Sequence, residues 1–144
     1  KEIPQNERVI AIEDTPEIKL GRNNSIGLVA VSGDQGEARV TIEELMRASL
    51  RMRPDRLIVG ELRGAETVTF LRAINTGHPG SISTIHASTT EGAFEQLALM
   101  CMQADLGLGR NETIDYARAM IDIIVQLDRK NGQRSIADIQ FKGD

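Results

Sequence analysis

Residues 57–64, LIVGELRG, decide the fold, because an apolar run of strand length ends there in the carboxylate of Glu61. A short apolar run of this kind predicts a buried strand. Residues 8–12, RVIAI, repeat the pattern and are followed directly by Glu13 and Asp14. A buried strand that ends in an acid therefore occurs twice. The pattern is typical of parallel strands whose carboxyl ends carry the functional groups.

Segments with helical spacing alternate with these strands. Thr41 and Glu44 form a capping box, which predicts a helix over 42–52, and a second helix is predicted over 65–75 before the Gly- and Pro-rich stop at 76–80. The remaining expectations are helices over 89–104 and, with Asn111 as a possible cap, over 112–121; strands over 28–31, 81–86, 123–127 and 135–141; a turn at 32–36; a linker at 106–109; and a hairpin turn at Asn131-Gly132.

The alternation predicts an α/β fold: a mostly parallel sheet flanked by helices, followed by C-terminal helices and a terminal β-hairpin. The length of 144 residues suits one domain, and 40% hydrophobic with 26% charged residues is the composition of a globular protein. Aromatic residues make up only 3%, so the core must be built from aliphatic side chains. Helices packed on a parallel sheet often have such a core.

Charge and composition argue against several other classes of protein. The net charge is −4 and the basic residues are spread along the chain, so direct nucleic-acid binding is not expected. No apolar run approaches the ~20 residues of a membrane span, and the first residues lack a signal-peptide core. The single cysteine, Cys101, is predicted to be a small buried hydrophobe. These features favour a cytoplasmic protein that reaches a membrane only through partners.

A third polar stretch, TGHPGSISTIHA at 76–87, contains both histidines. A histidine just past a strand can donate a hydrogen bond to a phosphate oxygen. Glu61 could polarise an attacking water or hold the water shell of Mg²⁺. Each of these residues alone is as well explained by a strand end, a turn or a surface contact. Two histidines and one distant cysteine show no spacing typical of a metal site.

Three longer stretches, taken in order, narrow these alternatives: RVIAIEDTPEI at 8–18, RASLRMRPDRLIVGELRGAET at 47–67 and LRAINTGHPGSISTIHA at 71–87. They resemble the Asp box, the Walker B region and the His box of the secretion ATPase superfamily. The Thr-Pro after Glu-Asp and the residues of the His box resemble the type IV secretion and conjugative-transfer branch more closely than the other branches. The resemblance covers nearly the whole chain and implies that residues 1–144 are part of a C-terminal, RecA-like P-loop NTPase domain.

The resemblance also implies roles for individual residues. Glu61 would be the Walker B glutamate that acts on the catalytic water and, through water, on Mg²⁺. Glu13 is similar to the catalytic acid of the Asp box, and His86 to the residue that senses the phosphates. Arg63 would link the nucleotide site to its surroundings, although a salt bridge to a nearby acid explains it equally well. Weaker candidates for nucleotide contact are Asp14, His78 and Thr84, and Arg51 and Arg53 could reach a neighbouring subunit or lie on the surface.

The chain departs from the superfamily in one respect, because its 144 residues contain no G-x-x-x-x-G-K-[S/T] and its four lysines lie outside any such pattern. That loop supplies most of the affinity for ATP. We therefore expect a fragment that begins after the P-loop and is inactive alone. The parent would be a hexameric ATPase that uses ATP and Mg²⁺ and works with inner-membrane secretion or conjugation components. The alternatives are a non-catalytic interaction module of such an apparatus and, as a third possibility, a metal-dependent hydrolase.

Overall fold

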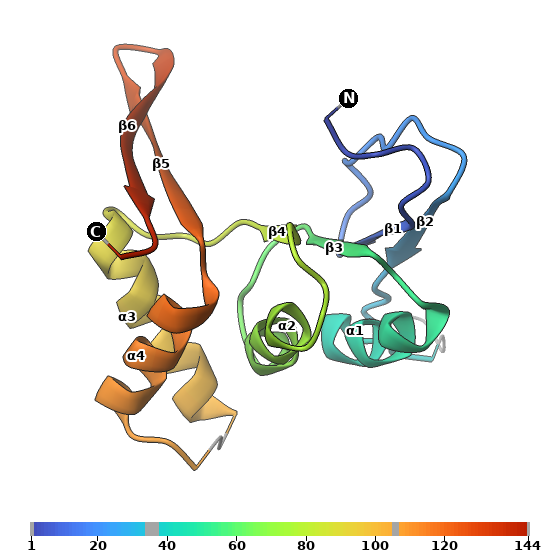
Figure 1. Ribbon diagram of the computed structural model, residues 1–144, viewed down its shortest axis with the longest axis horizontal. Helices are drawn as coiled ribbons and strands as arrows, with labels where there is room; N and C mark the ends of the chain where they lie inside the picture. Colours follow the sequence, from blue (N-terminus) through green and yellow to red (C-terminus); the bar gives the residue numbers. More distant parts are fainter. Residues whose placement is uncertain (1, 34–37, 105–106, 144) are drawn as a thin grey trace. The chain divides into compact units, whose positions relative to one another are not determined.

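A computed structural model describes residues 2–33, 38–104 and 107–143. The chain divides into two compact units, residues 1–84 and 85–144, and each is described by itself (Figure 1). The predicted turn at 32–36 and the predicted linker at 106–109 fall partly outside the described residues, as does Lys1.

The first unit is built on a four-stranded parallel sheet with the strand order β2-β1-β3-β4. Val9 pairs with Ser25 on one side and with Arg56 on the other, and Ile58 pairs with Ile82. The predicted parallel sheet is therefore confirmed. The strands are β1 (Val9–Glu13), β2 (Ser25–Val29), β3 (Arg56–Val59) and β4 (Ile82–Ser83).

The core of this unit lies around β1, where every residue is buried. Val9, Ile10 and Ile12 have no exposed surface, and Leu57 of the neighbouring β3 has none either. A central parallel strand is covered on both faces and thus reads as a continuous apolar run instead of an alternating one. This is why RVIAI could be recognised as a strand from the sequence.

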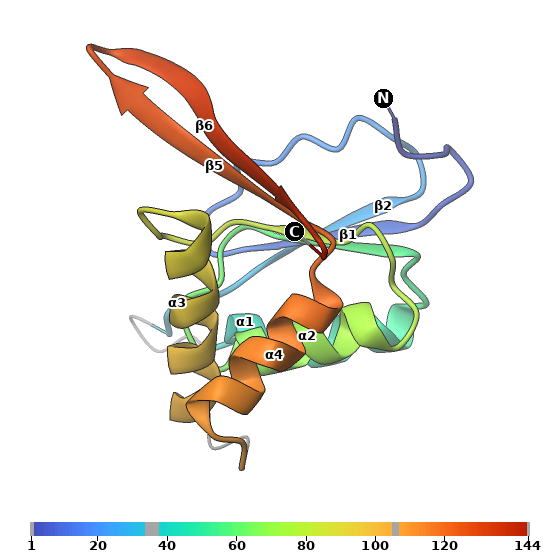
Figure 2. The ribbon, with the colours of Figure 1, turned by 60° about the vertical axis from the view of Figure 1, so that its left-hand side comes forward.

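The helices α1 (Ile42–Ser49) and α2 (Glu66–Asn75) lie on the same face of the sheet (Figure 2). The predicted capping box is present: the Glu44 N–H donates to Thr41 Oγ1 at 3.2 Å, and the Thr41 N–H donates to Glu44 Oε2 at 2.8 Å. The helix predicted over 42–52 is present as two parts: α1 ends at Ser49, and a 3₁₀ turn, η2 (Leu50–Met52), follows it directly. Met46 of α1 and Leu71 of α2 are fully buried apolar side chains.

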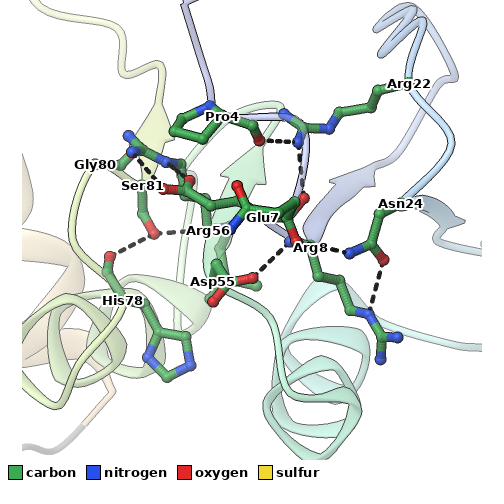
Figure 3. Close-up of polar contacts among 12 residues, drawn as sticks. Pro4, Glu7, Arg8, Arg22, Asn24, Asp55, Arg56, His78, Gly80 and Ser81 are labelled. Atoms are coloured by element: carbon green, nitrogen blue, oxygen red, sulfur yellow. Dashed lines mark hydrogen bonds and ion pairs between the residues drawn. The ribbon is translucent and has the colours of Figure 1, made fainter.

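A polar network joins the amino ends of the strands (Figure 3). Arg56, at the start of β3, forms an ion pair with Glu7, and its hydrogen bond lowers the pKa of that carboxyl. The Arg8 N–H donates to Asp55 Oδ2 at 2.6 Å, and Arg22 donates to the backbone oxygens of Pro4 and Glu7. The network fixes the segment that precedes β1 against the segments that enter β2 and β3.

The second unit pairs the helices α3 (Thr90–Gln103) and α4 (Arg110–Met120) with a β-hairpin. Phe94 and Cys101 of α3 and Ala117 of α4 are buried, and the Arg118 guanidinium lies 4.5 Å from the centre of the Phe94 ring. The hairpin consists of β5 (Ile123–Lys130) and β6 (Gln133–Phe141), which pair in antiparallel fashion. Asn131 and Gly132 both have positive φ, which confirms the predicted Asn-Gly turn.

Three local predictions were wrong. The strand expected over 28–31 is β2, and it begins at Ser25 because the whole length of β1 pairs with it. The strand expected over 81–86 is reduced to Ile82–Ser83. At its end the hydroxyls of Ser83 and Thr84 donate to the backbone oxygens of Val59 and Gly60. The helix expected from 112 begins at Arg110, and Asn111 is not its cap: the Glu112 side chain accepts the Gly109 N–H at 2.9 Å.

None of the helices in the described ranges has the length and the apolar character needed to cross a membrane.

Candidate functional site at the carboxyl edge of the sheet

Acidic side chains meet where the adjacent strands β1 and β3 end. Glu13 is the last residue of β1, Asp14 follows it, and Glu61 comes two residues after β3. Because the two strands are parallel neighbours, their carboxyl ends lie at one edge of the sheet. The structure thus brings together three of the acids that the sequence singled out.

Glu13 is the buried member of this group, with only 6% of its surface exposed. Its Oε1 accepts the N–H groups of Glu17 at 2.8 Å and Ile18 at 2.9 Å. A Cβ placed on Gly60 would lie 3.4 Å from Glu13 Cγ, at van der Waals contact, so the segment just after β3 lies directly beside this side chain. Glu13 therefore holds the segment after β1 in place, whatever else it does.

Arg63 joins the other two acids. Its Nε lies 2.6 Å from Glu61 Oε2 and its Nη2 forms an ion pair with the same oxygen, while Nη1 lies 2.8 Å from Asp14 Oδ2. The Glu61 side chain is 14% exposed, whereas those of Arg63 and Asp14 are 63% and 55% exposed. The hydrogen bond with Glu61 and then the charges of Glu61 and Asp14 raise the pKa of Arg63, which stays charged. The salt bridge considered from the sequence is present, with two acids.

The backbone of Arg63 is fixed by a residue that the sequence analysis did not single out. Glu66, the first residue of α2, accepts the N–H groups of Arg63 at 2.6 Å and Gly64 at 2.8 Å through its Oε1. An acid in the first turn of a helix can reach back in this way to N–H groups of the residues just before the helix. The sequence feature that could have predicted this contact is the position of Glu66, an acid three residues after Arg63 at the start of a predicted helix.

Thr84 also belongs to this edge of the sheet. Its hydroxyl donates to the backbone oxygen of Gly60 at 2.7 Å, and its own backbone oxygen accepts the Leu62 N–H at 2.9 Å. Ser83 donates similarly to the backbone oxygen of Val59 at 3.0 Å. These bonds attach the end of β4 to the segment that carries Glu61.

The two histidines do not share this placement. His78 follows α2 and precedes β4, so it lies at the amino edge of the sheet, where its Nδ1 is 3.1 Å from the Ala73 backbone oxygen and its own backbone oxygen accepts the Ser81 hydroxyl (Figure 3). His78, a candidate for nucleotide contact, is thus separated from the acids at the carboxyl edge, because β4 runs between it and Thr84. His86 is exposed and belongs to the second unit.

The two other arginines considered for contacts lie near the end of η2 and are exposed. Arg53 has a φ of 53°, in the left-handed region that non-glycine residues seldom adopt. It ends the 3₁₀ turn just before the buried Pro54. A surface role explains both side chains within this unit.

Comparison with known proteins gives consistent matches. The family described as Type II/IV secretion system protein matches residues 1–138. The Bartonella quintana Type IV secretion system protein VirB11 is 43% identical over 141 residues, which are 96% of this chain and 40% of that protein. Bordetella pertussis PtlH, also a type IV secretion system protein, is 38% identical over 98% of this chain and 44% of its own length.

Among solved structures, the VirB11 ATPase from the Brucella suis type IV secretion system, in complex with sulphate, matches with a TM-score of 0.87 and 33% sequence identity. The match covers 97% of this chain and 41% of that one. The chain thus spans less than half the length of the proteins that it resembles.

Proposed function

Since the chain belongs to the Type II/IV secretion system protein family, we propose that it is part of an ATPase that powers type IV secretion or conjugative transfer. The observation that carries the proposal is the cluster of Glu13, Asp14, Glu61 and Arg63 at the carboxyl edge of the parallel sheet. Nucleotides bind at this edge in open α/β folds. The relatives named VirB11 and PtlH support the choice of secretion apparatus.

Glu61 is the acid that we assign to the attacking water. It is mostly shielded from solvent and follows a buried strand, so its carboxylate can accept a hydrogen bond from a water held at the strand end. Glu13 is the second catalytic acid of the proposal, and His86, Arg63 and Thr84 are the proposed contacts to nucleotide. Asp14 and His78 were the remaining candidates, and the amino-edge position of His78 makes it the weakest.

Mg²⁺ is the metal that this site would take together with ATP. Mg²⁺ is bound in such sites by one or two carboxylates and substrate phosphates, and keeps several waters. The Glu61 carboxylate fits that mode of binding through water, and the described residues include no cluster of three or more His, Cys, Asp or Glu side chains that could hold an ion without nucleotide. The ion would neutralise the charge that develops on the phosphates.

The proposal extends to the assembly. The full-length protein would form a hexameric ring, and it would work in the cytoplasm, held at the inner membrane by secretion or conjugation components. No direct contact with nucleic acid is proposed, because the chain carries a net charge of −4.

A non-catalytic interaction module is the second candidate. It is favoured by one observation, that the acids at this edge already make structural contacts: Glu13 Oε1 accepts two backbone N–H groups, and Arg63 pairs with Glu61 and Asp14. The two candidates differ in a simple respect: an ATPase gains turnover when a P-loop is supplied upstream, and an interaction module does not.

ATP binding and hydrolysis should therefore be compared between this chain and a form extended upstream to include a P-loop. We expect only the extended form to bind and hydrolyse ATP. In the extended form, Glu61→Gln should abolish turnover and leave nucleotide binding intact, because the amide keeps the shape but cannot accept a proton.

Glu43→Gln is the matched control, since Glu43 is a partly exposed acid on α1 whose ion-pair partner is Arg47 and not Arg63. It should hydrolyse ATP at the rate of the unmodified protein. An extended form that neither binds nor hydrolyses ATP would favour the interaction module instead.

A further inference from the structure

Asp14, Arg63 and Glu61 form a chain of ion pairs across the ends of two strands. One edge of the Arg63 guanidinium, Nε and Nη2, faces Glu61 Oε2, and Nη1 at the other side faces Asp14 Oδ2 at 2.8 Å. The planar fork of arginine lets one side chain hold two carboxylates at fixed angles, which a lysine ammonium cannot do in the same way. Arg63 thus connects the acid after β1 with the acid after β3.

Two members of this series of ion pairs, Asp14 and Arg63, lie on fixed backbone. Asp14 directly follows the buried Glu13, whose carboxylate holds the N–H groups of Glu17 and Ile18. Arg63 is held at its own N–H by Glu66 at 2.6 Å. Since the backbone is fixed at both points, the direction of the Glu61 carboxylate depends on where Asp14 holds the Arg63 guanidinium.

We propose that Asp14 is a positioning residue that acts on Glu61 through Arg63 and is not a nucleotide ligand. The inference rests on the proposed ATPase function and deepens it. Asp14 holds the outer side of the Arg63 guanidinium, and Arg63 in turn orients the Glu61 carboxylate for the attacking water. Asp14 therefore contributes to the rate of hydrolysis only as long as Arg63 is present.

The charges at this edge favour the same division of roles. Glu13, Asp14 and Glu61 are three acids at neighbouring strand ends, and a nucleotide adds further negative charge. A carboxylate that contacted phosphate directly would repel it. Because Asp14 pairs with Arg63, the charge of Asp14 is compensated, and Arg63 holds the Glu61 carboxylate in a defined orientation.

A double-mutant cycle in the extended, P-loop-containing protein tests the proposal. Asp14→Asn, Arg63→Gln and the double variant are compared for kcat, and the dissociation constant of a fluorescent ATP analogue is measured for each in the Glu61→Gln background. Arg63→Gln should lower kcat by about 10- to 100-fold, the usual effect of removing a group that orients a catalytic one. Asp14→Asn should lower kcat by up to about tenfold, because the amide holds the guanidinium less firmly.

The double variant should match Arg63→Gln within about twofold in kcat, because residues that act through one another are not additive. Nucleotide affinity should change by less than about twofold in Asp14→Asn. Arg63→Gln and the double variant should share one and the same loss of affinity, because both lack the proposed contact of Arg63 with nucleotide. Arg63→Lys should recover part of the lost kcat, since it keeps the charge without the fork. Arg47→Gln, which removes an exposed ion pair on α1, is the control and should keep the unmodified kcat.

A further loss in the double variant equal to the loss caused by Asp14→Asn alone would overturn the proposal. So would a weakened nucleotide affinity in Asp14→Asn. Thermal unfolding of each variant identifies a loss of kcat caused by misfolding. If Glu61→Gln still hydrolyses ATP, it is the proposed function that fails; if Glu61→Gln is inactive and the cycle is additive, only the role of Asp14 fails.

Discussion

Single residues decide how the loops at the amino edge of the sheet can pack. Gly80 has a φ of +70°, and a Cβ built on it would lie 1.9 Å from Nη1 of Arg56. That guanidinium is engaged by Glu7 and is directed toward the Gly80 backbone oxygen (Figure 3). The Gly80 position therefore combines a backbone conformation that favours glycine with a close approach by a side chain that is already paired.

We expect Gly80→Ala to lower the free energy of unfolding by more than the about 1–2 kcal/mol that left-handed backbone costs a non-glycine residue. The methyl group adds to that cost because it displaces the Arg56 guanidinium from Glu7. Urea unfolding followed by circular dichroism measures the change. Gly132→Ala is the control, with a φ of +80° and no atom within 4 Å. Equal losses for the two variants would mean that the contact with Arg56 contributes nothing.

At the scale of elements, the hairpin has an unusual distribution of side chains. Its exposed face consists of three apolar cross-strand pairs, with side chains 44–69% exposed: Ile123 with Phe141, Val125 with Ile139, and Leu127 with Ile136. Its other face is polar and is held within the second unit, where Gln126 donates to the Ala87 backbone oxygen at 3.2 Å and Thr90 donates to Asp138 Oδ2 at 3.1 Å. Contiguous exposed apolar surface of this kind promotes association.

The isolated chain should accordingly self-associate as its concentration rises. Replacing the apolar pair nearest the turn, Leu127→Lys with Ile136→Lys, should shift the chain toward monomer, because two charges on that face oppose its burial between copies. Analytical ultracentrifugation over a range of concentrations measures the shift. Gln133→Lys with Ser135→Lys adds the same charge on the opposite face and should change association much less. A chain that is monomeric throughout would contradict the expectation.

For the molecule as a whole, the two compact units each have a core of their own. Cys101 is the thiol within the second core, has no exposed surface and lies among the apolar residues of α3. Burial raises the pKa of the Cys101 thiol, which lowers the fraction of reactive thiolate at neutral pH. The prediction of a small buried hydrophobe at this position is confirmed, and the residue is a natural probe of the second unit.

A thiol reagent at neutral pH should therefore leave Cys101 unlabelled in the native chain and label it as urea opens the second unit. The rate of labelling should rise in parallel with the loss of helical circular dichroism. The Ser88→Cys variant adds an exposed thiol in the same unit and should be labelled at once. If Cys101 reacted natively as fast as that added thiol, its burial would be refuted.

Some elements of the fold could be predicted from the sequence and others could not. The sequence predicted two strands and one helix cap correctly: RVIAI, LIVGE and Thr41–Glu44. These features could be predicted because apolar runs, acids near strand ends and capping boxes depend on residues that are neighbours in the chain. The Asn131-Gly132 hairpin was recognised because two successive positive φ angles limit the residue types. Asn111 was mistaken for a cap because Gly109, which has no side chain to signal it, takes that place with help from Glu112.

The sequence by itself thus determined the α/β class, the parallel strands, the helices, the acid that ends β1 and the acid that follows β3, because local periodicity and chain order carry that information. Tertiary structure alone decided that β1 and β3 are neighbours, that Arg63 spans from Glu61 to Asp14, and that His78 and Thr84 lie at opposite edges. Asp14 and Arg63 are far apart in the sequence, and only the pairing of parallel strands brings their charges within hydrogen-bonding distance.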